Sequence, residues 1–343
     1  MQATIKILIS TGIIASTTLV AASNNWLLAW LSLELNTLTI LPIISKTKHP
    51  RATEAATKYF LTQAIASCLL LFSSTTNAWQ TGLWNITQMS NELQSTTMLI
   101  ALTMKLGAAP IHFWLPEVMQ GTSIKTALLI STWQKIAPIT LMFSMSNHLP
   151  QKTTLIVALL SMFSGGWAGM NQTQLRKTMA YSSIANLGWT LLTMTSEPKT
   201  SLINIFTYMI ITIPTFLLMA LTSTKTLQAM TTTWTSSPTT STSLAILLLS
   251  TAGLPPLTGF LPKLLILDQL VTQNLTPMAV MAMISSLLTL VFYLRIMYLT
   301  TLLNPPCSST STTKWRQNMN GTKMVSLVPP ATTMLTALPA LLL

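Results

Sequence analysis

Long apolar runs recur from one end of the 343-residue sequence to the other, and they constrain its fold more than any other feature. A helix needs about 20 apolar residues to cross the roughly 30 Å hydrocarbon core of a bilayer, whereas a membrane β-barrel shows shorter segments of alternating residues. The runs therefore predict an all-α polytopic membrane protein with about eleven transmembrane helices. The expected spans lie at about 3–22, 25–45, 54–74, 96–119, 123–145, 153–170, 175–194, 199–222, 242–270, 276–302 and 324–343.

Charge is scarce along the chain. Only 7% of the residues are charged, against about 25% in a soluble domain, which excludes a disordered chain and argues against a soluble enzyme. The net charge of +12 does not indicate nucleic acid as a partner, because the basic residues are scattered between apolar runs. Cys68 and Cys307 belong to no CxxC or Cys/His pattern, so neither a disulfide framework nor a zinc site is expected. The first run lacks a clean cationic start and an A-x-A cleavage site, and apolar runs continue after it, so we expect it to be a retained span rather than a signal peptide.

The loop cations predict the orientation of the bundle. With the N-terminus inside, the outside loops carry only Lys152 and Lys199, and the positive-inside rule favours this arrangement. Eleven spans would then place the C-terminus outside. The inside ends and loops carry Lys6, Lys46, Lys48, Arg51, Lys58, Arg176, Lys177, Lys225, Lys314, Arg316 and Lys323.

Two of the expected spans are interrupted. The fourth contains Lys-Leu-Gly-Ala-Ala-Pro over 105–110, and the ninth contains Gly-Leu-Pro-Pro over 253–256. Proline breaks the hydrogen bonds of a helix, and such breaks survive in a membrane where they line a protein or water cavity. The breaks fall five spans apart, which predicts two inverted five-helix repeats and a C-terminal helix, and favours a transporter site. The alternative is that two proline kinks merely shape the bundle. The predicted boundaries are 1–145 for the first repeat, 153–302 for the second and 324–343 for the last helix.

Four ionisable residues lie within the expected spans: Glu34, Lys105, Lys135 and Lys263. A charge at bilayer depth costs roughly 2.5–3.5 kcal/mol, so the set is hard to explain by packing, although a single lysine can extend to the headgroups. Burial disfavours the charged form and a nearby opposite charge favours it, so Glu34 paired with Lys105 would act as a proton switch. Lys135 and Lys263 would extend it into a relay. His112 is either a further member of the relay or a hydrogen-bonded packing residue.

At these motifs the sequence resembles a known family, the antiporter-like subunits of respiratory complex I. The resemblance covers the whole chain, and it is carried by Lys-Leu-Gly-Ala-Ala-Pro-Ile-His-Phe-Trp-Leu-Pro-Glu over 105–117 and by Gly-Leu-Pro-Pro-Leu-Thr-Gly-Phe over 253–260 with Lys263. It implies that Glu34 and Lys105 are the charged pair of the family, that Lys135 is its central lysine, and that Lys263 is the residue of the second broken helix. Some relatives carry glutamate at this last site, so the resemblance implies an exit step that differs from theirs. The span count resembles a shortened animal form that lacks the first three helices.

The resemblance also implies function, partners and location. We expect a core subunit of the NADH:ubiquinone oxidoreductase translocase that moves protons across the mitochondrial inner membrane, with its N-terminus on the matrix side. NADH, FMN, iron–sulfur clusters and ubiquinone would be bound by other subunits, and this chain would carry no cofactor, metal or redox site. The expected partners are the other subunits and lipids, cardiolipin among them. The alternatives are a subunit of a cation/proton antiporter and a purely structural linker of the membrane arm.

Overall fold

The computed structural model describes residues 2–47, 49–89, 91–231, 233 and 238–301, and helices account for nearly all of the regular structure in these ranges. The only β-structure in the described ranges is two isolated bridges. The first helices are α1 (Gln2–Ala22), α2 (Trp26–Ile44), α3 (Pro50–Thr81), α4 (Glu92–Leu106), α5 (Trp114–Gly121), α6 (Ile124–Ser131) and α7 (Trp133–Ser144). The later helices are α8 (Gln151–Met170), α9 (Leu175–Leu192), α10 (Pro198–Thr222), α11 (Leu227–Met230), α13 (Pro238–Ala252), α14 (Phe260–Thr272) and α15 (Thr276–Thr301).

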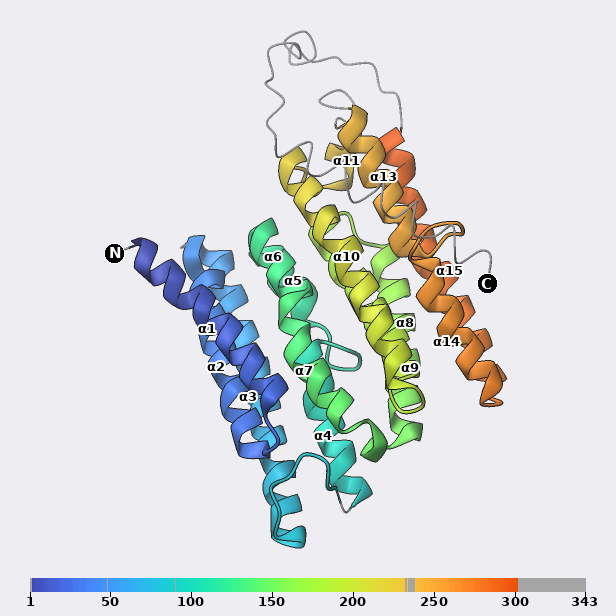
Figure 1. Cartoon of the computed structure of the whole chain (residues 1–343). Coiled ribbons are helices and arrows are strands. Elements are labelled where there is room, and N and C mark those ends of the chain that lie inside the picture. The colour runs from blue at the N-terminus through green and yellow to red at the C-terminus, as the bar shows by residue number, and fades with distance from the viewer. Residues whose placement is uncertain (1, 48, 90, 232, 234–237, 302–343) are drawn as a thin grey trace. The chain divides into compact units, whose positions relative to one another are not determined.

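The chain forms two compact units. Unit 1 comprises Met1–Ser161 with Leu191–Pro198, and unit 2 comprises Met162–Thr190 with Lys199–Leu343. Within unit 1, α1, α2 and α3 lie side by side, and α3 also packs against α4 and α5 (Figure 1). The helix α7 contacts both α1 and α4. Unit 1 is therefore a helical bundle with the first interrupted helix, α4–α5, packed against α3.

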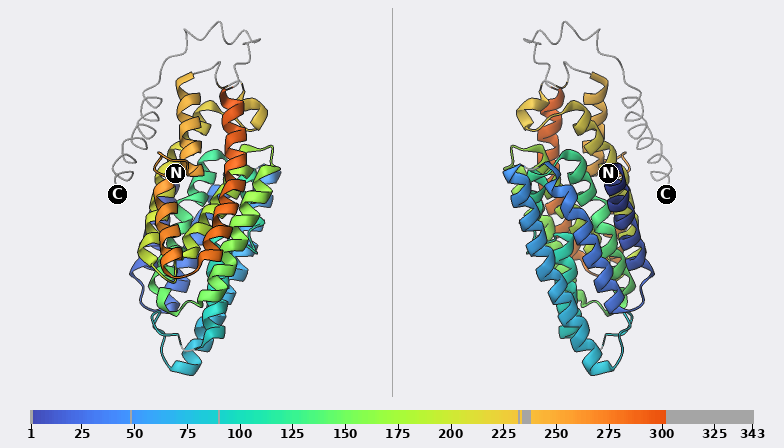
Figure 2. Two further views of the ribbon diagram at one scale, coloured as in Figure 1. Left: turned by 90° about the vertical axis from the view of Figure 1, so that its right-hand side faces the viewer. Right: turned by 90° about the vertical axis from the view of Figure 1, so that its left-hand side faces the viewer.

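Unit 2 contains the second interrupted helix, α13–α14. Both halves pack against the long helix α15, which is drawn in red-orange in Figure 2. The small residues of α8 allow a close approach to α9, because a Cβ added at Gly165 would lie 2.7 Å from the backbone nitrogen of Ala185. This is the close packing that a small-xxx-small pattern permits between membrane helices.

The helix α3 shows why these sequences form lipid-facing helices. Proline at its first position and the His49 side chain, which accepts from the Arg51 backbone N–H, define its start. Its buried residues Ala52, Ala55 and Tyr59 recur at helical spacing, while Phe60 and Leu61 on other faces are exposed. A large apolar outer surface indicates contact with a membrane or with a partner protein. Six described helices are long and apolar enough to cross one.

The structure refines the spans expected from sequence. The spans at about 96–119 and 242–270 are each two helices separated at the proline motif, as expected. The span at about 123–145, expected to be continuous, is also divided, because α6 ends at Ser131 and α7 begins at Trp133. The span at 324–343 lies outside the described residues. The count of eleven helices and the inverted repeat stay predictions.

Candidate functional site

The interruption between α4 and α5 shapes the first half of the site. The helix α4 ends at Leu106 and is capped by Gly107, whose φ of +78° is left-handed and favours glycine. A Cβ at this position would also lie 2.8 Å from Cδ1 of Leu115. The break frees the last carbonyls of α4, and these find new partners. Trp114 Nε1 donates to the Met104 carbonyl at 3.2 Å, and Gln63 Nε2 of α3 donates to the Lys105 carbonyl at 3.4 Å.

Lys105 lies in the last turn of α4, directly before this break. Its side chain is only 6% exposed, so it does not extend to a surface. Its Nζ atom has no hydrogen-bond partner in the part of the chain that the structure describes. Lys105, which the sequence singled out as an ionisable residue within a span, is therefore a buried amino group without a hydrogen bond to the described residues.

Lys135 lies in the first turn of α7, beside the interruption that the sequence did not reveal. The Thr132 hydroxyl donates back to the Leu128 carbonyl at 2.7 Å, and the Lys135 backbone N–H donates to the Thr132 carbonyl at 3.2 Å. These bonds hold the junction without proline or glycine. Lys135 is 3% exposed. Each of the two buried candidate lysines of unit 1, Lys105 and Lys135, therefore lies in a terminal turn of its helix.

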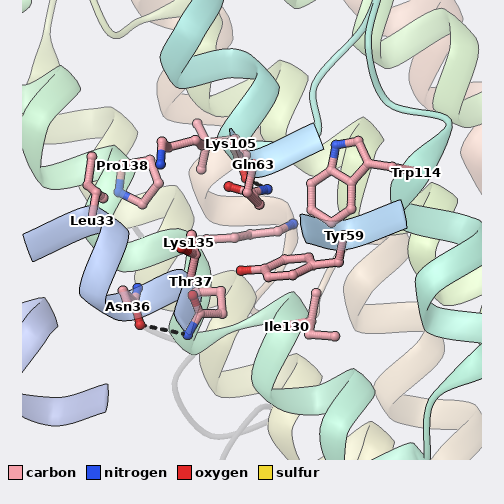
Figure 3. A pocket seen from close by; sticks show the side chains of 12 residues that line it. Leu33, Asn36, Thr37, Tyr59, Gln63, Lys105, Trp114, Ile130, Lys135 and Pro138 are labelled. Carbon is pink, nitrogen blue, oxygen red and sulfur yellow. Dashed lines mark hydrogen bonds between the residues drawn. The ribbon is translucent and has the colours of Figure 1, made fainter. Parts of the chain in front are cut away.

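The structure brings Lys105 and Lys135 to the same internal pocket, shown in Figure 3. The pocket leaves about 20 Å³ for the centre of a water molecule, and about 10–15 Å³ suffices for one water. Asn36 and Gln134 line it and are joined by a 3.1 Å hydrogen bond from Gln134 Nε2 to Asn36 Oδ1. Other side chains with polar atoms in the lining are Thr37, Tyr59, Gln63 and Trp114.

Glu34 and Lys105 interact electrostatically but are not hydrogen-bonded. Both Glu34 Oε2 and Lys105 Nζ lack a hydrogen-bond partner among the described residues. Glu34 is half-buried on α2 and does not line the pocket of Figure 3. The charged pair expected from sequence is therefore a pair in electrostatic range, without direct contact.

Lys263 lies in unit 2, in the first turn of α14 after the second break. The helix α13 ends at Ala252, and Gly253 follows with a left-handed φ of +81°. Lys263 Nζ donates to the Ala252 carbonyl at 2.6 Å and lies 5.6 Å from the ring centroid of Trp189. The side chain is 8% exposed. Lys263 thus satisfies a carbonyl that the break frees, as a cation does at a helix C-terminus.

His112 lies in the turn between α4 and α5 and is 6% exposed. Its Nδ1 atom has no partner among the described residues, and its ring lies 4.3 Å from that of Phe113. His112 does not line the pocket that contains Lys105 and Lys135. The structure therefore does not bring it together with these lysines.

Several pocket residues were missed by reasoning from sequence. Asn36, Gln63 and Gln134 come from three different helices, α2, α3 and α7, and none of them carries a charge. The available signal was weak: on α3, the buried polar residues Gln63, Ser67 and Ser74 recur on one face. Such a polar stripe on a lipid-exposed helix indicates the side that faces a polar interior.

A charged cluster of a different kind lies at the exposed end of α3. Lys58 binds Glu54 of the same helix and Glu117 of α5, both at 2.6 Å. This cluster joins α5 to α3 outside the pocket.

In unit 2, Arg295 donates to the Met170 carbonyl at 3.1 Å.

Interrupted helices in corresponding places of two halves are typical of membrane transporters. Residues 23–289 match the family described as NADH:quinone oxidoreductase/Mrp antiporter, TM. NADH-ubiquinone oxidoreductase chain 2 of Varanus nebulosus is 51% identical over 334 residues, covering 96% of each chain. The same-named chain of Salmo salar is 47% identical over 332 residues, covering 93% of this chain and 95% of the salmon chain.

A solved structure supports the fold. A chain of respiratory complex I from Thermus thermophilus with bound aureothin superposes with a TM-score of 0.84, at 23% identity, over 97% of this chain and 78% of that one. The present chain belongs to the NADH:quinone oxidoreductase/Mrp antiporter membrane family, within the group of NADH-ubiquinone oxidoreductase chain 2.

Proposed function

We propose that this chain is a core membrane subunit of respiratory complex I and that it translocates protons through Glu34, Lys105, Lys135 and Lys263. Its membership of the chain 2 group supports the assignment to the complex. NADH oxidation, with FMN and iron–sulfur clusters, and ubiquinone reduction take place on other subunits, which are the partners of this chain. Lipids, cardiolipin among them, cover the remaining apolar surface.

The pocket shared by Lys105 and Lys135 is the observation that carries this proposal. A proton passes between two amino groups when a hydrogen-bonded water or side chain connects them, and the pocket has room for about one water. Its polar side chains supply acceptors and donors around that space. Lys105 Nζ has no structural hydrogen bond, so a change in its protonation breaks none.

The charges explain how such a relay responds to its surroundings. A buried lysine keeps its proton more readily while a carboxylate nearby is ionised. Glu34 interacts electrostatically with Lys105 without being hydrogen-bonded to it. When Glu34 is protonated or displaced, Lys105 therefore releases its proton more readily. Lys263 is the proposed relay residue of unit 2, and the Ala252 carbonyl holds its amino group in place.

The proposed location is the mitochondrial inner membrane, with the N-terminus on the matrix side. The support is the distribution of loop cations, which favours the N-terminus on the positively charged side. Its family gives the membrane character of the chain.

The test replaces Lys135 with methionine in a homologous complex that can be mutated and assembled. Lys135→Met removes the titratable group and keeps the apolar length of the side chain, so we expect proton pumping per NADH oxidised to fall. Lys125→Met is the matched control, since Lys125 is exposed and does not line the pocket. Pumping is measured as acidification outside sealed vesicles, together with NADH oxidation.

The same measurement separates the alternatives. Unchanged pumping in assembled Lys135→Met complex would reject the relay and favour a structural linker subunit. Transport that depends on a metal cation and proceeds without NADH would favour a cation/proton antiporter subunit.

A further inference from the structure

A large groove lies on unit 1, between α1, the end of α2 and the junction of α6 with α7. Its volume is about 730 Å³, far more than that of the pocket between Lys105 and Lys135. The side chains along α1 are mostly apolar, and Ile5, Ile9 and Ile13 recur there at four-residue intervals. Ile5 is 54% exposed, so the groove opens to the surroundings of the chain.

The length of the groove along α1 is about the thickness of one leaflet of the hydrocarbon core. Along α1 its lining runs from Ile5 to Ile14, and at 1.5 Å per residue this corresponds to about 14 Å. The hydrocarbon core of a bilayer is about 30 Å thick, so the groove spans about half of it. Its length and apolar walls match an acyl chain of a single leaflet.

The two charged residues that line the groove lie at the same end. Lys6 is near the start of α1, and Lys46 follows the end of α2, which runs antiparallel to α1. Both side chains are exposed, and no Asp or Glu is among the lining residues. This end therefore offers two cations at the depth where a lipid headgroup would lie.

We propose that this groove binds one anionic phospholipid, with its phosphate between Lys6 and Lys46 and an acyl chain along Ile5, Ile9 and Ile13. Charge selects this occupant over a transmembrane helix of a partner. The ends of membrane helices on the positively charged side carry an excess of Lys and Arg, so a helix there would place like charges against Lys6 and Lys46. The inference requires the chain to lie in a membrane, but it does not require the chain to move protons.

The test measures lipid retained by the full-length chain. The purified chain is reconstituted in nanodiscs of phosphatidylcholine with a minor fraction of phosphatidylglycerol, extracted in mild detergent, and analysed by native mass spectrometry. We expect the wild-type chain to retain phosphatidylglycerol in preference to phosphatidylcholine. Each basic side chain near the membrane surface contributes about fivefold to the binding of anionic lipid, so Lys6→Gln with Lys46→Gln should weaken retention by more than about tenfold.

Two further variants control the experiment. Lys125→Gln with Lys152→Gln removes the same charge from exposed lysines that do not line the groove, and should retain the lipid. Ile9→Trp fills the apolar part and should expel the lipid without a change of charge. Equal retention of the two lipids by the wild-type chain would overturn the proposal, as would equal loss in the two double variants. A polypeptide found in the groove in place of lipid would overturn it too.

Discussion

The two interrupted helices differ in which group donates a hydrogen bond to the carbonyl freed at the break. In unit 1 the Met104 carbonyl accepts from the Trp114 indole and from the Gly107 backbone N–H, and the Lys105 amino group is left without a hydrogen bond. In unit 2 the lysine itself, Lys263, binds the exposed carbonyl of Ala252. A buried carbonyl needs a hydrogen-bond donor at both breaks. Only in unit 1 does the lysine beside the break keep an amino group without a hydrogen bond. The same residue type at a similar motif therefore has a structural bond in one unit and none in the other.

The largest expected effect tests the tight contact around Lys263. Gly253→Ala forces a left-handed φ on alanine and places Cβ 2.8 Å from Cδ of Lys263, so the lysine must leave the Ala252 carbonyl. We expect a loss of unfolding free energy of about 3 kcal/mol, from backbone strain and the lost hydrogen bond. The measurement is denaturant unfolding of the purified full-length chain in detergent micelles.

A double-mutant cycle sharpens this result. Gly253→Ala should cost less in a Lys263→Met background, because the side chain that it displaces is gone. At the first break, Lys105 is not among the close neighbours of Gly107, so Gly107→Ala and Lys105→Met should be additive. Additivity at both breaks would refute the difference between them.

Lys263→Met should cost about 2 kcal/mol, because it leaves the buried Ala252 carbonyl unsatisfied and removes the contact with Trp189. Lys105→Met removes a buried amino group that satisfies nothing, so its expected effect on unfolding is close to zero or stabilising. Matching unfolding midpoints in the two variants would contradict the comparison.

Trp114→Phe removes one hydrogen bond from the first break and keeps most of the ring. The Met104 carbonyl then loses its indole donor, and we expect a cost of about 1 kcal/mol. The matched control is Trp167→Phe on α8, whose side chain is 72% exposed and should be neutral. A larger cost in the control variant than in Trp114→Phe would mean that the indole bond is not what supports the break.

The smallest expected effect concerns the attachment of α5 to α3. Lys58→Gln removes ion pairs to Glu54 and Glu117 that are exposed to the surroundings, where such pairs contribute little. We expect a slight loss of stability that disappears when wild type and variant are compared in high salt. A loss that persists in high salt would show that this cluster supports the first break more strongly than its exposure indicates.

The sequence predicted the proline breaks and the buried lysines because both are local signals against an apolar background. Snorkelling, a real alternative for Lys105 and Lys263, is excluded by their burial. The junction at Thr132 could not be predicted, because it contains neither proline nor glycine and is held by hydroxyl and backbone bonds. The different bonding of Lys105 and Lys263 was also hidden, since it depends on which partner from elsewhere in the fold reaches the freed carbonyl. The assignment of these residues to a relay remains a prediction.

The size of the pocket between Lys105 and Lys135 limits which ions it can hold. A proton needs only a hydrogen-bonded connection, whereas a sodium or potassium ion crosses apolar surroundings only with its hydration shell or an equivalent set of oxygen ligands. The pocket has room for about one water molecule, which is enough for a hydrogen-bonded connection but too little for a hydrated metal ion. The proposed proton relay would therefore not require a space large enough for a hydrated metal ion.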